Sequence, residues 1–137
     1  MAPRPAAEEG QATLEAALVL PILLLLIIGM VGVAQVLHAS TMTVLAATRG
    51  ARLAAVVYGN PSLTPEDQER QVTTAVEATL AAGLRGADYS ITVMPAGDDV
   101  RVEVVYREAL SLPWIHTILG DDTWTVGHVA VNRIEQQ

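Results

Sequence analysis

The chain has 137 residues, with 8 basic and 15 acidic side chains and no cysteine. The resulting net charge of −7 argues against nucleic-acid binding, which needs a basic surface, and the lack of cysteine excludes disulfides, thiolate metal sites and thiol catalysis. Hydrophobic residues make up 51% of the chain and charged residues only 17%, so part of it is more apolar than a soluble domain requires.

The first predicted element is an apolar segment near the N-terminus. Residues 16–48 carry no charged side chain, and between Ala16 and Leu37 the only strongly polar residue is Gln35. About 20 apolar residues suffice to cross the hydrocarbon core of a bilayer. Pro21 is tolerated if the helix begins only a turn or two before it. Residues 16–37 therefore predict one transmembrane helix.

A cleaved secretory signal is the competing interpretation of this segment. Such a signal needs a basic start and a small-residue cleavage site, which Gly32–Ala34 would supply. Arg4 is outnumbered by the acidic residues that precede the apolar run, and that run is longer than a signal requires. Arginine counts leave the orientation of a membrane helix undecided, because Arg49 and Arg52 follow the span while Arg4 precedes it.

A carboxylate, Glu15, stands where the apolar segment begins. A glutamate in the first turn of a helix is favoured by the helix dipole, which would account for it without a further role. An ionisable group at the edge of a membrane is also a candidate functional residue. Cleavage after Gly10 would make Gln11 the new N-terminus, and its α-amino group would lie four residues from Glu15 on one helix face. That spacing offers the carboxylate a partner, on its own chain or on a neighbour.

Beyond the apolar segment the helix is expected to continue, from about Thr13 to Val57, because the following residues are rich in alanine. The cluster Tyr58-Gly59-Asn60-Pro61 should end it. Small residues recur along this part every four positions: Ala39, Thr43, Ala47, Ala51 and Ala55, with Ala46, Gly50 and Ala54 beside them. Such a stripe allows close helix packing, although abundant alanine alone would produce the same pattern.

The remaining residues, 61–137, predict a small head. Thr64–Asp67 has the features of a helix start, and an apolar stripe continues to Leu84, so that Gly83 or Gly86 should end the helix. Alternating apolar residues predict a β-hairpin, with strands from Tyr89 and from Val100 joined by a turn at Pro95–Asp99, and a third strand at Thr123–Ile134.

We therefore expect an α+β fold: a long N-terminal transmembrane helix, then a head with one helix packed on a three-stranded antiparallel sheet. The expected domains are a leader at 1–10, the transmembrane and extended helix at 11–60, and the globular head at 61–137. Docking onto the helix would stabilise a head of this size.

A search for catalytic chemistry finds no candidate. The three histidines, His38, His116 and His128, are widely separated, and no serine has the context of a nucleophile elbow. The paired carboxylates Asp98-Asp99 and Asp121-Asp122 are typical of solvated turns. We expect no enzyme activity, no cofactor and no metal site.

The N-terminal segment Glu9–Pro21 resembles a type IV prepilin. A short leader ends in Gly10, a glutamate follows as the fifth residue after it, and an apolar helix begins there. The segment departs from the standard pattern in two places: no basic residue stands just before Gly10, and Gln11 replaces the usual aromatic residue.

Within that superfamily the chain is most similar to TadE-like pseudopilins and minor pilins of tight-adherence (Tad/Flp) systems. The run Glu15–Pro21, ahead of a leucine-rich stretch, resembles theirs. So does Ala46–Val56, in which Thr48-Arg49 replaces the usual Arg-Glu pair, and more weakly the C-terminal segment Val129–Glu135.

This resemblance implies a membrane-anchored structural protein that assembles into, or initiates, a Tad-type pilus for adhesion or secretion. It implies processing between Gly10 and Gln11 by a prepilin peptidase and an assembly role for Glu15. The implied partners are the membrane, other pilin subunits and the pilus assembly platform. The implied location is the bacterial cytoplasmic membrane, crossed once, with the C-terminal head outside the cytoplasm. The alternative is an uncleaved single-pass membrane protein whose acidic extracytoplasmic head binds a partner.

Overall fold

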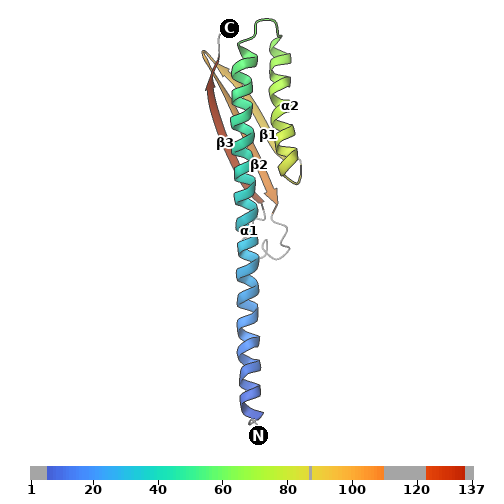
Figure 1. The fold of residues 1–137 in the computed structure, drawn as a ribbon, viewed down its shortest axis with the longest axis vertical. Helices are drawn as coiled ribbons and strands as arrows, with labels where there is room; N and C mark the ends of the chain where they lie inside the picture. The colour runs from blue at the N-terminus through green and yellow to red at the C-terminus, as the bar shows by residue number, and fades with distance from the viewer. Residues whose placement is uncertain (1–5, 87, 110–122, 135–137) are drawn as a thin grey trace. The chain divides into compact units, whose positions relative to one another are not determined.

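The computed structural model describes residues 6–86, 88–109 and 123–134. The elements in chain order are helix α1 (Ala6–Tyr58), helix α2 (Pro65–Gly83) and strands β1 (Tyr89–Ala96), β2 (Asp99–Ala109) and β3 (Thr123–Arg133), shown in Figure 1. The predicted α+β fold is confirmed: a long apolar N-terminal helix, a second helix and a three-stranded antiparallel sheet. The segment Leu112–Gly120, between the predicted hairpin and the predicted third strand, lies outside the described residues.

The chain forms two compact units, an N-terminal unit (Met1–Gln35) and a C-terminal unit (Val36–Gln137), and α1 contributes to both. In the N-terminal unit the helix starts at Ala6 and not near Thr13. Alanines and glutamates precede Gly10, and both residue types favour the start of a helix. Pro21 therefore lies well inside the helix and not in its first turns.

The sheet of the C-terminal unit has the strand order β1-β2-β3, with each pair antiparallel. The turn between β1 and β2 consists of Gly97 and Asp98 alone, which is shorter than the expected turn because Pro95 still pairs with Val100 in the sheet. Gly97 has a φ of +63°, the conformation that a two-residue hairpin turn of type II′ requires at its first position.

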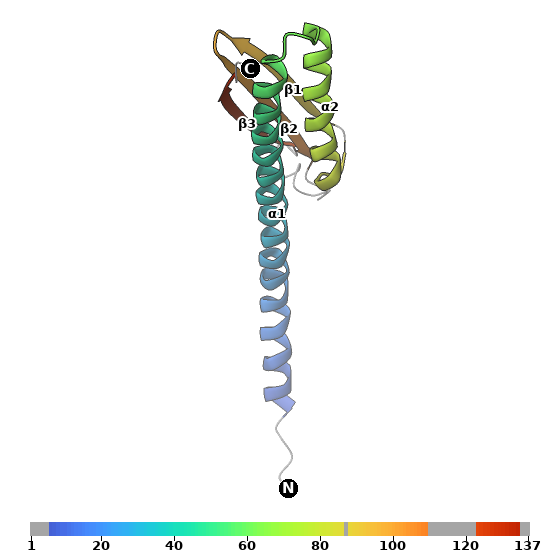
Figure 2. The same ribbon diagram turned by 45° about the horizontal axis from the view of Figure 1, so that its top comes forward.

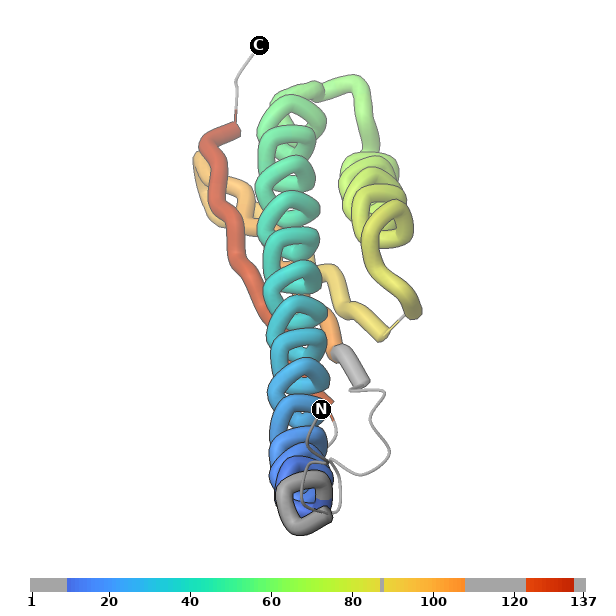
Figure 3. Tube along the Cα trace, turned by 60° about the horizontal axis from the view of Figure 1, so that its bottom comes forward, coloured from blue at the N-terminus to red at the C-terminus, as the bar shows by residue number. Residues whose placement is uncertain are grey.

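The core of the C-terminal unit lies between α1, α2 and one face of the sheet. Figures 2 and 3 show the end of α1 lying across the sheet, with β3 on one side of it and α2 on the other. Most of its buried residues are alanines of α1 and valines of the central strand. The buried cluster contains Ala39, Ala46, Ala47, Ala51, Ala54 and Ala55 of α1, Val72, Val76 and Leu80 of α2, and Val100, Val102, Val104 and Tyr106 of β2.

Gly50 is a point at which α1 approaches its neighbours closely. A Cβ atom at this position would lie 2.5 Å from Cγ2 of Val76 and 3.2 Å from Cγ1 of Val102. Neither distance leaves room for a methyl group without movement of buried side chains. The small-residue stripe of α1 therefore has a packing role, and its partners are α2 and β2 of the same chain.

Both ends of α2 are fixed by specific contacts. The predicted N-cap is confirmed, because the Thr64 hydroxyl accepts a hydrogen bond from the backbone N–H of Asp67. The helix ends at Gly83, one of the two predicted positions. There the Gly83 carbonyl lies 2.9 Å from Nε2 of His38 on α1, and the Met42 side chain packs where a larger residue than glycine would place its Cβ.

Candidate processing and assembly site

The three residues predicted for processing and assembly, Gly10, Gln11 and Glu15, all lie exposed on α1. The side-chain amide Nε2 of Gln11 donates to Oε1 of Glu15 over 3.4 Å. The i,i+4 spacing therefore brings residues 11 and 15 together on one helix face, as expected. In the uncut chain the partner of the carboxylate is a neutral amide.

Cleavage after Gly10 would change the chemistry of this contact. The new α-amino group would be a cation within the first turn before Glu15, and an ammonium–carboxylate pair is stronger than an amide–carboxylate hydrogen bond. The peptide bond between Gly10 and Gln11 is helical in the structure, so a protease must first open the end of α1. Opening is inexpensive there, because helix ends fray more readily than helix interiors.

Gly10 is not required by the packing of the helix. A Cβ atom at this position would meet nothing within 4 Å. A glycine in a helix costs about 1 kcal/mol relative to alanine. The packing of the fold therefore gives no reason for glycine at this position.

The helix that follows is long and apolar enough to cross a membrane. A window within Gly10–Tyr58 has a mean hydropathy of 2.9, and none of it is buried. Large side chains such as Leu18 and Ile22 are more than 60% exposed. Such a continuous apolar surface indicates contact with lipid or with other helices.

The described histidines and the Asp98-Asp99 pair lie on different elements of the chain. His38 is engaged with the Gly83 carbonyl, and His128 is half-buried in β3, while His116 lies outside the described residues. Asp98 lies in the hairpin turn, where its carboxylate is 3.7 Å from Arg133. Within the described residues no group of three or more acidic or histidine side chains could hold a metal ion.

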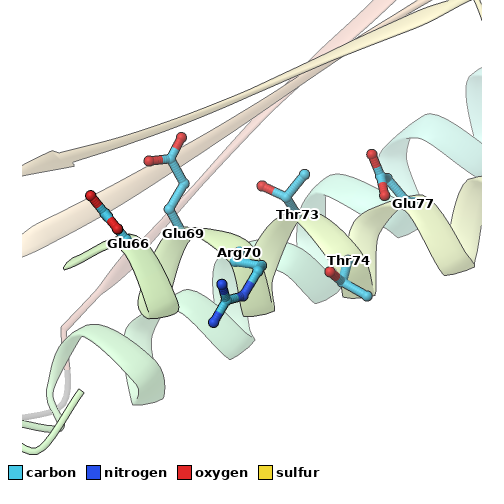
Figure 4. A pocket seen from close by; sticks show the side chains of 6 residues that line it. All are labelled: Glu66, Glu69, Arg70, Thr73, Thr74 and Glu77. Carbon is cyan, nitrogen blue, oxygen red and sulfur yellow. The ribbon is translucent and has the colours of Figure 1, made fainter. Parts of the chain in front are cut away.

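One surface feature of the C-terminal unit was not anticipated. The exposed face of α2 forms a shallow hollow of about 400 Å³, whose labelled side chains appear in Figure 4. It is lined by Glu66, Glu69, Arg70, Thr73, Thr74 and Glu77. The spacing of these residues, three or four apart, is visible in the sequence and could have indicated a shared polar face. A second groove of about 460 Å³ lies between α2 and Leu53 of α1.

Comparison with known protein families identifies the N-terminal region. Residues 10–52 match the family of TadE-like proteins. The resemblance found in the sequence is thereby confirmed over these residues, which include the Gly10–Glu15 site and the exposed apolar helix. The family consists of structural pilin-like proteins. No curated protein and no solved structure matches the chain.

The TadE-like segment, residues 10–52, also reaches into the core of the C-terminal unit. It includes Gly50 and most of the buried alanines of α1, whereas α2 and the sheet follow it in the chain. The matched region thus joins an apolar helix suited to membrane anchoring to the helix surface on which the rest of the chain folds.

Proposed function

We propose that this protein is a membrane-anchored minor pilin or pseudopilin that assembles into, or initiates, a Tad-type pilus used for adhesion or secretion. The observation that carries the proposal is the TadE-like match, which covers the Gly10–Glu15 site together with an exposed helix able to span a membrane. In this role residues 1–10 are the leader, 11–60 the transmembrane and extended helix, and 61–137 the head.

Processing prepares the subunit for assembly. A prepilin peptidase removes the leader after Gly10, and Gln11 becomes the mature N-terminus. The new ammonium group pairs with Glu15 of its own chain or of a neighbouring subunit within the apolar helix bundle. Such a pair matters more there than in water, because a charge left without its partner in a desolvated site costs about 3–5 kcal/mol.

The proposed topology follows from the family and not from the charge pattern. The leader faces the cytoplasm, the helix crosses the cytoplasmic membrane once, and the head lies outside the cytoplasm. The assembly platform and other pilin subunits are the expected partners. Protease added to intact spheroplasts should digest the head and spare the membrane segment, and a protected head would reverse this orientation.

The intact mass of the protein, isolated from the membranes of a host with the matching peptidase, tests the proposal. We expect the mass of residues 11–137 for the wild type and a retained leader for Gly10→Leu. Gly29→Leu is the matched control, because a Cβ at Gly29 also meets nothing within 4 Å and this residue lies far from the cleavage point. A wild-type mass that includes the leader would contradict the pilin proposal and favour the uncleaved membrane protein. A new N-terminus near Gln35 would identify a secretory signal.

The role of Glu15 has its own test. Glu15→Gln should leave membrane insertion and cleavage unchanged but lower the amount of protein in sheared pilus fractions, because the neighbouring ammonium loses its charged partner. Glu103→Gln on β2 controls for the loss of a carboxylate elsewhere. If Glu15 acts only on the helix dipole, its contribution stays below about 1 kcal/mol and both variants assemble equally.

A further inference from the structure

Two exposed helix faces of the C-terminal unit carry opposite charge. The first is the outward face of α1, where Leu45, Arg49, Arg52 and Val56 follow one another at intervals of four, three and four residues. This spacing places them in one stripe along the helix. All four are exposed, and neither arginine forms an ion pair within the part of the chain that the structure describes. We call this stripe the arginine face.

The second face is the hollow on α2, which has a net negative charge. Its only cation, Arg70, is paired with Asp67 of the same helix, so that charge is already compensated. Glu66, Glu69 and Glu77 form no ion pair among the described residues. We call this surface the acidic face. Figure 4 shows these side chains along one side of α2.

The two faces overlap in height along the C-terminal unit, at Arg49 and Glu77. Gly50 of α1 approaches Val76 of α2, and Met42 approaches Gly83, so the two helices run antiparallel. Arg49 and Glu77 each lie one residue from the contact between Gly50 and Val76. Because a helix rises about 1.5 Å per residue, the two charged residues are at nearly equal height. Neighbouring copies that stand side by side in one membrane would keep these heights matched.

We propose that the arginine face of one copy binds the acidic face of a second copy of this chain, with Arg49 and Arg52 entering the hollow that Glu69 and Glu77 line. The proposal rests on the proposed function, since it describes how subunits that share a membrane orientation contact each other in an initiating complex. Opposite charges attract across such an interface, whereas two arginine faces or two acidic faces repel. The exposed apolar side chains of Leu45 and Val56 become covered at the same time.

The interface is heterologous, because each copy uses one face to bind and offers a different face to the next copy. Contacts of this kind generate rings or open helical assemblies and not closed two-fold dimers. All copies keep their N-terminal helices in the same direction, as anchoring in one membrane demands. Both surfaces of the proposed interface therefore belong to this chain.

Charge reversal with rescue tests the interface in the full-length chain. Two copies with different tags are expressed together in membranes, one with Val56→Cys and the other with Thr73→Cys, and treated with a short bismaleimide crosslinker. The chain has no native cysteine, so every crosslink between two copies joins the introduced positions. Arg49→Glu with Arg52→Glu should lower the heterologous crosslink about tenfold, as should Glu69→Arg with Glu77→Arg. All four changes together should restore it, because the charges are then exchanged and again complementary. Arg101→Glu on the exposed sheet face is the control and should leave the crosslink unchanged.

The outcomes separate this interface from the proposed function. Failure of the fourfold variant to restore the crosslink would overturn the interface, and so would crosslinks between two Val56→Cys copies as strong as the heterologous ones. Reversal of the arginines that weakens binding to anionic vesicles, while the crosslink persists, would assign the face to lipid and overturn the interface. A crosslink that follows the charges in protein with an uncleaved leader would support the interface and contradict the pilin role. Protein found in sheared pili without the crosslink would support the pilin role and contradict the interface.

Discussion

The two stretches of α1 have the same backbone but opposite surroundings. Between residues 16 and 35 the helix carries leucine, isoleucine and valine all around, and these side chains are exposed. From Ala39 onward one side of the helix carries alanine, threonine and glycine, and these residues are buried. The difference shows that side-chain size, and not helix propensity, assigns each stretch to its environment. Large apolar residues suit lipid, whereas small residues let a strand and a second helix approach closely.

The largest effect on stability is expected when the second stretch of α1 is removed. A fragment of residues 36–137 should unfold cooperatively, whereas residues 61–137 should show no cooperative transition. The shorter fragment lacks the six buried alanines of α1 and the buried Val57, and it leaves the inner faces of α2 and β2 uncovered. Because domains are stable by only about 5–15 kcal/mol, that loss is decisive. Thermal unfolding followed by circular dichroism checks this, and equal midpoints would show that α1 is dispensable.

A smaller effect is expected from the same substitution in the two stretches. Gly50→Ala should lower the free energy of unfolding of the C-terminal unit by about 1–3 kcal/mol, since the added methyl group meets Val76 and Val102. Gly29→Ala meets nothing within 4 Å and should leave that free energy unchanged. Urea denaturation of full-length protein in detergent measures both. An unchanged free energy of unfolding for Gly50→Ala would mean that Val76 and Val102 move aside more easily than their contacts indicate.

A smaller effect again is expected from a contact near the boundary between the two stretches. His38 is the first residue after the apolar segment, yet its ring nitrogen Nε2 forms a hydrogen bond with the Gly83 carbonyl at the end of α2. His38→Ala should cost about 0.5–1.5 kcal/mol of unfolding free energy, the typical net value of one hydrogen bond. Faster hydrogen exchange at the C-terminal end of α2 would identify the cause. The neighbouring change Leu37→Ala, at an exposed residue, should not affect that exchange.

The smallest effect concerns the other end of the second stretch. Burial, and then the nearby carboxylate of Glu69, raise the pKa of Tyr58 above its ordinary value of 10.0. The folded state therefore favours the neutral phenol, so the contribution to stability is complete below pH 10 and is lost as the pH rises through the folded-state pKa. Denaturation of the 36–137 fragment between pH 9 and 11 should show a steeper loss for the wild type than for Tyr58→Phe. Parallel curves would contradict this.

Much of the fold could be predicted because several local signals agreed. The Thr64 cap, the helix end at Gly83 and the alternation in β1, β2 and β3 all appear in the structure. The predicted start of α1 near Thr13 is wrong: the helix begins at Ala6, because no residue between Ala6 and Thr13 gives a strong stop signal. The predicted turn at Pro95–Asp99 is too long, because Pro95 still belongs to β1, an edge strand that tolerates proline.

The candidate site was predictable in part. The contact between residues 11 and 15 follows from helical spacing alone. The purpose of the small-residue stripe could not be decided, because its partners Val76 and Val102 are distant in sequence and only the tertiary fold brings them to Gly50. The matched levels of Arg49 and Glu77 escaped prediction for the same reason. The assembly role of Glu15 stays a prediction.

The alanine side of α1 also has a consequence for biosynthesis. Val102 is translated 52 residues after Gly50 (102 − 50), so at ordinary rates this helix waits roughly 3–10 s for its partner strand. A leucine-rich surface in that interval would favour insertion into the bilayer next to the span. Alanine and glycine expose little apolar area, so a waiting helix with this surface would gain little from entering lipid. If the protein is anchored as proposed, the residues that allow close packing would thereby also mark where the nascent chain stops entering the membrane.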